Sequence, residues 1–472
     1  MPAAHAVPLL HLFAQRGRAL EFSGRYEQAL VNYREMETRA RERDDRVLEL
    51  AALMARATIR STPSAVHDPL RGKALSEQAL ILARELGDRQ AESKILWNLM
   101  LLSQFTGHMR QSVTYGEQSL TLARELDLRE QLAYTLNDGM RSYLGVGEFA
   151  RARAALDEAR DIWRALGNLP MLTDNLGRSA RIFFALGEYE RAIAAADEAR
   201  RLSESIGNLW GQAFCRMFVG DVYFERGDPA TAIETMTECI RVAAQAGLVM
   251  ALVCTRADLA WIYGTLGAIE AGLEMGRLAQ ATAAQRLPVF LPWALGSLAR
   301  LQVMQGDLAA AETSVAEAYV GLELDDFSTH GAVQVPMADA ELALARRNYA
   351  HVISVMDGLI ARLRRVGMRS FLSDALYLKG QALLAQDQIE AARQVLSDAR
   401  ADAESLGSRR MLWPILASLS IIEAGRGHHA EEQQLRAQAR ELIEYIASHI
   451  PTKQLSDSFL QQPLVRTIVD LP

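Results

Sequence analysis

The sequence predicts an all-α solenoid of about eleven helical hairpins, and three observations support this prediction. Helix-forming Ala, Leu, Glu and Arg dominate the 472 residues, half of which are hydrophobic. The alternation typical of strands is nearly absent. The segment "MRSYLGVGEFARARAALDEARDI" is followed forty residues later by "ARIFFALGEYERAIAAADEARRL". A fixed period of this length is typical of stacked helical hairpins that bury their apolar faces against one another.

The glycine before "EF" or "EY" gives the register of the repeat. Glycine suits this position because it adopts the left-handed conformation that ends a helix, with no Cβ clash. Positions in register with it lie 39 to 43 residues apart along the chain. We therefore expect hairpin turns near Gly24, His67, Gly107, Gly147, Gly187, Gly227, Gly267, Gly306, Arg347, Asp387 and Gly427.

Each repeat contains two amphipathic helices. In the first helix, Leu132, Leu136 and Met140 recur at four-residue intervals, which indicates one buried face. In the second helix, "FARARAALDEARDIWRAL", Ala152 and Leu156 begin the inner face. A second series of turns follows these helices at Gly87, Asp127, Gly167, Gly207, Gly247, Gly367 and Gly407.

Small residues recur on both helices, where they let the two helices of a hairpin approach closely. They stand seven residues before the turn, as at Gly220 and Gly380, and five residues after it. The second set comprises Ala29, Ala152, Ala192, Ala232, Ala311 and Ala392.

Three segments depart from the repeat. "STPSAVHDPLRG" at 61–72 contains Pro63 and Pro69, which end the preceding helix. "LELDDFSTHGAVQVP" at 322–336 forms a longer connection. We expect both to be surface loops. Residues 451–472 leave the pattern, so we expect an array over 1–450 and a C-terminal capping segment over 451–472 that covers the last hairpin.

Composition excludes several classes of protein. The formal net charge is −7 and there is no Lys/Arg block, so we expect no binding to nucleic acid or to an anionic membrane surface. There is no uncharged apolar stretch of membrane-spanning length, and we expect no secretory signal. The odd set Cys215, Cys239 and Cys254 contains no CxxC, which favours inert buried thiols in a reducing cytoplasm.

Few residues suggest catalysis. The glycine-rich phosphate-binding motifs are absent from the sequence. His428 and His429 have glutamates nearby, but adjacent helical residues point about 100° apart and do not converge on one ion. We therefore expect a solvated turn there, no metal, no cofactor, no catalytic residue and no enzymatic activity.

An aromatic residue four positions before the turn completes the pattern at Tyr143, Phe183, Tyr223 and Tyr263. Over residues 10–445 this pattern resembles the tetratricopeptide repeat (TPR) in its kinesin-light-chain-like form of about forty residues. The chain, with its "FLQQPLVRTIV" tail, is similar to the C-terminal sensor arrays of bacterial signalling ATPases and transcriptional regulators. This resemblance implies a right-handed superhelix whose first helices line a concave wall.

On that geometry, one set of side chains forms a groove with a basic centre at Arg141 and Arg181. Arginine engages carboxylates through paired hydrogen bonds, and asparagine binds peptide amides. The expected groove comprises Trp97, Tyr134, Asn137, Arg141, Asp174, Arg181, Phe184, Asp221, Trp261 and Arg300. The alternative is that these charges form a solvated face with an Arg181–Asp221 ion pair, and that the aromatics belong to the core.

We therefore expect a non-catalytic scaffold or sensor that binds an acidic or mixed protein or peptide on its concave face. A regulatory domain in cis or in trans is a further expected partner. Two alternatives remain open: a small-molecule-sensing domain of a larger signalling ATPase or transcriptional regulator, and a self-assembling structural array.

Overall fold

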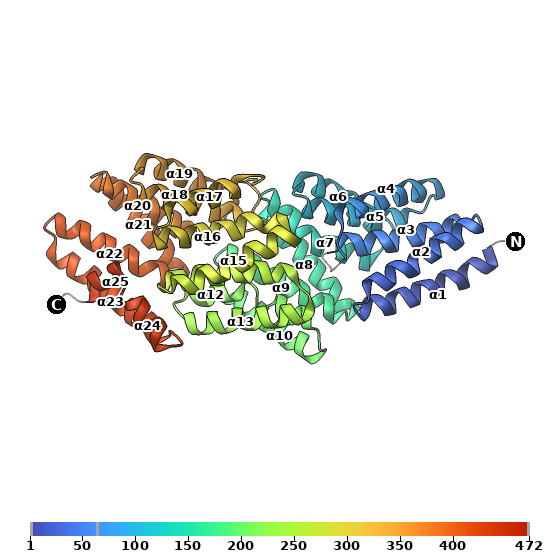
Figure 1. Ribbon diagram of the computed structural model, residues 1–472, viewed down its shortest axis with the longest axis horizontal. Helices are drawn as coiled ribbons and strands as arrows, with labels where there is room; N and C mark the ends of the chain where they lie inside the picture. Colours follow the sequence, from blue (N-terminus) through green and yellow to red (C-terminus); the bar gives the residue numbers. More distant parts are fainter. Residues whose placement is uncertain (1–2, 63–65, 470–472) are drawn as a thin grey trace. The chain divides into compact units, whose positions relative to one another are not determined.

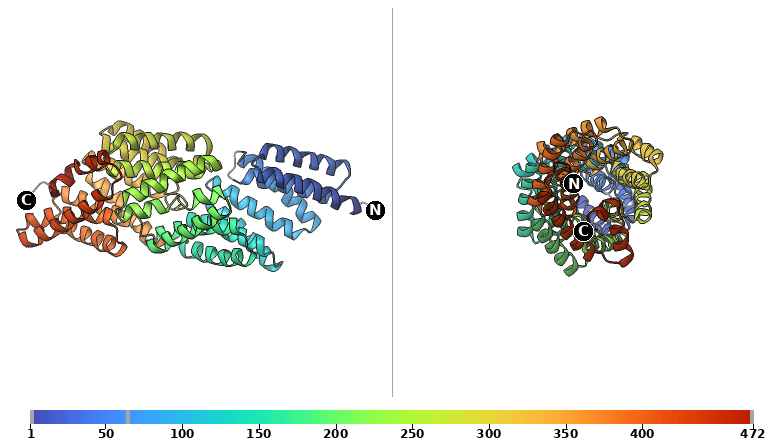
Figure 2. Two further views of the ribbon diagram at one scale, coloured as in Figure 1. Left: turned by 90° about the horizontal axis from the view of Figure 1, so that it is seen from below. Right: turned by 90° about the vertical axis from the view of Figure 1, so that its left-hand side faces the viewer.

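The chain is an all-α helical-repeat protein in a computed structural model that describes residues 3–62 and 66–469. It divides into two compact units, Met1–Asn168 and Leu169–Pro472. In both units antiparallel helix pairs stack side by side (Figures 1 and 2). The described residues contain no strand.

The described residues of the first unit form four hairpins. Their helices are α1 (Ala3–Phe22), α2 (Tyr26–Glu42), α3 (Arg46–Ser61), α4 (Pro69–Leu86), α5 (Arg89–Phe105), α6 (Met109–Glu125), α7 (Arg129–Gly145) and α8 (Phe149–Leu166).

The part of the second unit that the structure describes forms seven hairpins and two short helices near the C-terminus. In chain order, the unit begins with α9 (Leu169–Ala185), α10 (Tyr189–Ser205), α11 (Leu209–Phe214), α12 (Val219–Glu225), α13 (Pro229–Ala246), α14 (Val249–Thr265), α15 (Ile269–Arg286), η1 (Pro288–Phe290) and α16 (Leu291–Gln305). The remaining helices are α17 (Leu308–Tyr319), α18 (Gly331–Ala345), α19 (Tyr349–Val366), α20 (Leu372–Ala385), α21 (Ile389–Leu406), α22 (Arg409–Gly425), α23 (His429–Ser448), α24 (Lys453–Leu460) and α25 (Pro463–Val469).

The backbone takes the left-handed conformation at nearly all of the expected turns. All the glycines of both turn series have positive φ, and so do Asp127, Arg347 and Asp387, which replace glycine in the register. His67 does not, although it lies in the predicted connection, between α3 and α4. Pro63 lies outside the described residues.

The close approach of paired helices is also confirmed. The alanines five residues after the turns are fully buried, as Ala152 and Ala192 illustrate. At Gly220 an added Cβ would lie 2.6 Å from Cγ of Met236, and at Gly380 it would lie 2.7 Å from the side chain of Leu396. These contacts require small residues at the crossings of the helices.

Two features of the second unit differ from the expectation. The inner helix of one repeat is broken into α11 and α12. In the turn between them, the backbone N–H groups of Arg216 and Met217 donate hydrogen bonds to the carbonyls three residues earlier in the sequence. The connection before α18 is not a surface loop along its whole length, because Phe327, Ser328 and His330 are buried. A loop predicted to lie in solvent thus runs into the interior of the unit.

Early and late hairpins of the second unit contact one another directly. The carbonyl of Ala185 at the end of α9 accepts hydrogen bonds from the backbone N–H groups of Arg369 (2.7 Å) and Ser370 (3.1 Å). The side chain of Gln462 donates to the carbonyl of Thr265 at 2.9 Å, at the end of α14. The last carbonyls of an inner helix have no hydrogen-bond partner within the helix. Here they accept hydrogen bonds from residues about 200 positions away in the sequence.

The C-terminal helices α24 and α25 pack against α22 and α23. Their buried side chains are Leu455, Phe459, Val465 and Ile468. The ring of Phe459 meets that of Trp413 edge-on at 6.1 Å. A capping role for 451–472, of which the structure describes 451–469, stays a prediction.

Candidate functional site

In the first unit, the predicted groove residues lie on α5 and α7, where Trp97, Asn137 and Arg141 are buried and Tyr134 is half-buried. Nε1 of Trp97 donates to Oδ2 of Asp138 at 2.9 Å. The Tyr134 ring lies 5.7 Å from that of Trp97 and 4.9 Å from that of Trp163. Asn137 is fully buried. These side chains pack against the unit's own helices.

The two arginines of the expected basic centre also contact the protein itself. The Arg141 guanidinium is buried and lies 4.9 Å from the centre of the Phe105 ring. Arg181 donates to the carbonyls of Phe327 (3.1 Å) and Ser328 (2.6 Å), and so holds the loop before α18. The arginine at 181 thus positions a buried loop of the second unit.

The other predicted groove residues of the second unit are buried rather than exposed on an open wall. The residues concerned are Asp174, Phe184, Asp221, Trp261 and Arg300. Arg178 donates to Asp174 at 2.7 Å, and Arg300 donates to Glu341 at 2.7 Å. Phe184 and Trp261 both pack against the ring of Phe371. Their role in partner binding stays a prediction, and in this conformation their contacts are with their own chain.

A buried ion-pair group links the early and late hairpins of this interior. Arg410 on α22 donates to Glu225 on α12 at 2.5 Å and to Asp374 on α20 at 2.8 and 2.9 Å. Its guanidinium also lies 4.7 Å from the Trp261 ring. Burial alone lowers the pKa of Arg410, but the carboxylates of Asp374 and Glu225 hold it above its ordinary value. The guanidinium therefore stays charged inside the unit.

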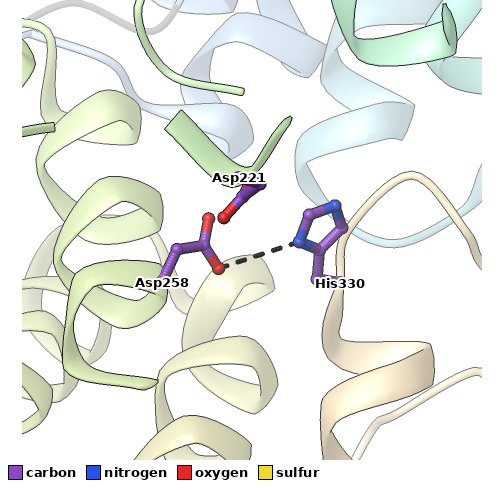
Figure 3. A group of neighbouring side chains, drawn as sticks. All are labelled: Asp221, Asp258 and His330. Carbon is purple, nitrogen blue, oxygen red and sulfur yellow. Dashed lines mark ion pairs between the residues drawn. The ribbon is translucent and has the colours of Figure 1, made fainter. Parts of the chain in front are cut away.

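Beside this group, three further side chains converge, which we call the DDH cluster: Asp221, Asp258 and His330 (Figure 3). They come from α12, from α14 and from the residue just before α18. Their possible ligand atoms all lie within 4.8 Å of one another, and each residue is at most 3% exposed. The broken inner helix and the buried loop thus supply two of the three members.

The electrostatics of the DDH cluster are unusual for a protein interior. Burial, followed by the neighbouring carboxylates of Asp258 and Glu225, raises the pKa of Asp221 well above its ordinary value. Burial lowers the pKa of His330, which keeps its imidazole neutral at pH 7. Nδ1 of His330 lies 3.8 Å from Oδ1 of Asp258, beyond hydrogen-bond distance. The oxygen of Asp258 instead accepts from Nε1 of Trp293 at 2.9 Å.

The first unit contains a different kind of candidate site, a solvent-open cavity of about 350 Å³ between α2, α3 and α4. We call it the arginine pocket. It is lined by Leu30, Arg34, Glu37, Arg56, Arg60, Arg71, Ala74, Leu75 and Gln78. Burial, then the positive charges of Arg34 and Arg60, lowers the pKa of Arg56. Four cations and a single carboxylate therefore share one small cavity, and this favours an anionic ligand.

Sequence reasoning did not find the arginine pocket or the DDH cluster. One local signal was present for the pocket, because Arg56 and Arg60 stand four residues apart on one face of α3. The DDH cluster had no local signal, since its members are separated by 37 and 72 residues in sequence.

The cysteines and the paired histidines lie where the sequence suggested. The three cysteines are free and buried, and burial raises the pKa of Cys215 to about 11 and that of Cys239 to about 12. His428 lies at the turn, where its Nδ1 is 2.7 Å from Oε2 of Glu423. His429 does not belong to the group of possible ligands that Glu423, His428 and Glu431 form.

No described helix is both long enough and apolar enough to cross a membrane.

The fold, the left-handed turns and the small residues at the helix crossings define the chain as a TPR-type helical-repeat protein. The family described as "MalT-like TPR region" matches residues 94–413, about two thirds of the sequence. The chain belongs to this family. A search of the curated proteins found no match.

Solved structures with a similar fold include BtubC (BKLC) from P. vanneervenii, at 19% identity and a TM-score of 0.40, covering 47% of this chain and 92% of that one. Yeast Tom70 matches at 12% identity and a TM-score of 0.37 over 100% of both chains. A Rap protein complexed with competence and sporulation factor matches at 10% identity and a TM-score of 0.38, over 95% of this chain and 99% of that one.

Proposed function

We propose that this chain is a non-catalytic binding module, a scaffold or sensor that recognises an acidic segment of a protein or peptide. The observation that carries the proposal is the arginine pocket of the first unit. Its four arginines supply many hydrogen-bond donors around a space of about 350 Å³, large enough for a carboxylate side chain. Arginine is the residue best suited to bind carboxylates through two parallel hydrogen bonds.

The charges of the pocket are only partly satisfied within the chain. Glu37 accepts hydrogen bonds from both Arg56 and Arg41. Arg60 donates to the backbone carbonyl of Val66, and Arg71 lies 3.5 Å from Asp68. One lining carboxylate thus faces four lining guanidinium groups, so an acidic ligand would relieve their mutual repulsion.

A role in regulation fits this activity. Membership of the MalT-like TPR region family and the resemblance to sensor arrays support a place in bacterial signalling, with a regulatory domain in cis or in trans. Three reduced, buried cysteines suit a cytoplasmic protein.

A second candidate function is the sensing of a small ligand inside the second unit. It is favoured by the inward-facing charges and by the contacts between Glu225 and Arg410, which leave this interior unsuited to an extended peptide. In the DDH cluster such a ligand would meet three buried polar atoms that make no hydrogen bond.

Fluorescence anisotropy with a short labelled peptide of alternating Glu and Ser tests the proposal. The double substitution Arg34→Ala and Arg71→Ala removes two exposed cations of the pocket. We expect it to weaken binding about tenfold, because each exposed charge contact contributes about 0.7 kcal/mol. Affinity for the peptide should also fall as salt increases.

The matched control is Arg277→Ala with Arg286→Ala, which removes two exposed arginines of the second unit. This variant should bind as the unmodified chain does. Equal weakening by both double substitutions would mean that the peptide responds only to net charge, and the pocket would be excluded as its site.

A further inference from the structure

The DDH cluster contains polar atoms that the protein leaves without partners. Oδ2 of Asp221, Oδ2 of Asp258 and Nδ1 of His330 are all buried and make no hydrogen bond. A buried polar atom without a partner costs about 1–3 kcal/mol, and more when it carries charge. Three such atoms in one cluster are therefore unexpected unless another species binds them.

The three side chains point toward one another. In Figure 3 the carboxylates of Asp221 and Asp258 lie next to each other, and a dashed line joins Asp258 to the imidazole ring of His330. Their ligand atoms lie within 4.8 Å of one another. A bound transition metal with bonds of about 2.1 Å spaces its ligand atoms about 3–4 Å apart. A small inward rotation of the two carboxylates would bring the ligand atoms to this spacing.

Contacts with neighbouring residues of the protein hold two of the possible ligands, Asp258 and His330, in place. Trp293 donates to Oδ1 of Asp258, and its ring lies 4.2 Å from that of His330. Arg181 binds the carbonyls of the loop that carries His330. Such outer contacts are typical of metal sites, where they orient the ligands.

The charge of the surroundings also favours a cation. Four buried carboxylates, those of Asp221, Glu225, Asp258 and Asp374, lie in this interior. Of the nearby cations, Arg410 pairs with Glu225 and Asp374, and Arg181 donates to the carbonyls of the loop before His330. A divalent cation would neutralise the remaining two carboxylates.

We propose that Asp221, Asp258 and His330 form a binding site for a divalent first-row transition metal, such as Zn²⁺ or Mn²⁺. One imidazole and two carboxylates are a donor set that these ions accept, whereas Mg²⁺ prefers oxygen ligands alone. The site joins α12, α14 and the start of α18, so a bound ion would crosslink three hairpins of the second unit. It is independent of the arginine pocket.

The test is the metal content of the full chain, carrying no histidine tag, after expression in medium supplemented with Zn²⁺, Mn²⁺ or Mg²⁺. Expression with the metal allows a buried site to fill as the chain folds. After desalting, mass spectrometry should find one Zn²⁺ or Mn²⁺ per chain and no Mg²⁺. A chain that retains no transition metal would overturn the proposal.

Two conservative variants, Asp221→Asn and His330→Gln, should lose the ion. The control His428→Gln, in the other group of possible ligands with Glu423 and Glu431, should keep it. Loss of the ion from His428→Gln with retention in His330→Gln would place the metal at the surface turn and refute the proposal.

Tryptophan fluorescence provides a readout that does not depend on how the ligand variants fold. Because Trp293 contacts both Asp258 and His330, removing the ion with a chelator should change its emission. The Trp293→Phe chain should lack this change. An identical change in both chains would mean that the metal lies elsewhere.

Discussion

At the scale of single residues, charged side chains in this protein are placed inside as well as on the surface. Arg410, Glu225 and Asp374 are all at most 6% exposed, and their charges are satisfied only by one another, by Ser408 and by nearby rings. Removing Arg410 would leave both carboxylates buried without a counter-charge.

We therefore expect Arg410→Met to destabilise the second unit by about 3–5 kcal/mol. Chemical denaturation followed by circular dichroism measures the effect. The exposed ion pair of Arg241 and Glu238 supplies the control, since Arg241→Met should leave the stability nearly unchanged. Equal small effects in both variants would show that the buried group does not join the early and late hairpins.

The cysteines give a second prediction at this scale. Because thiolates are the reactive form and burial raises the pKa of Cys215 and Cys239, the folded chain should react with a thiol-specific reagent very slowly at pH 8. After denaturation all three thiols should react at once. A rapidly modified thiol in the folded chain would contradict the packing described for its helix.

At the scale of helices, the repeat depends on how closely neighbouring helices approach. An added Cβ at Gly296 on α16 would lie 2.9 Å from the backbone carbonyl carbon of Gln334 on α18. A backbone neighbour cannot move aside as the end of a flexible side chain can, so α16 and α18 would have to separate.

We expect Gly296→Ala to lower the free energy of unfolding by about 1–3 kcal/mol. At Gly358 on α19, the nearest atom to an added Cβ is the end of the Arg362 side chain, at 3.5 Å. The same substitution there should stabilise the chain by about 0.5–1 kcal/mol, because alanine favours the helix more than glycine does. Thermal unfolding of both variants measures this difference in sign, and a stable Gly296→Ala chain would argue against the α16–α18 contact.

The sequence predicted the hairpins well because their determinants are local. Turn glycines and apolar spacing lie within one repeat, so the left-handed turn at Gly147 and the buried Ala152 follow from short segments. The burial of Phe327 and His330 could not be predicted in this way. It depends on Arg181, which is about 150 residues away and reaches the loop only in the folded unit.

The candidate site residues show the same contrast between local and long-range determinants. Register correctly placed Asp221, Trp261 and Arg300 on inner helices, but the sequence could not reveal that later hairpins would cover them. The burial of these residues depends on contacts such as that between Glu225 and Arg410, which stand 185 positions apart. Long-range pairing of this kind leaves no periodic trace in the sequence.

At the scale of the whole molecule, the two units offer different surfaces to a ligand. In Met1–Asn168 the arginine pocket is open to solvent, whereas in Leu169–Pro472 the inner charges face other parts of the same unit. An acidic partner should therefore bind the first unit and leave the interior of the second largely unchanged.

Hydrogen exchange of the full chain, measured by mass spectrometry with and without the acidic peptide, tests this claim most directly. We predict that the peptide slows exchange within Tyr26–Leu86, the segment that spans α2 to α4 and lines the arginine pocket. Exchange in α12, α14 and α16 of the second unit should not change. Protection confined to those inner helices, with none between Tyr26 and Leu86, would contradict the account and would return the binding site to the concave wall.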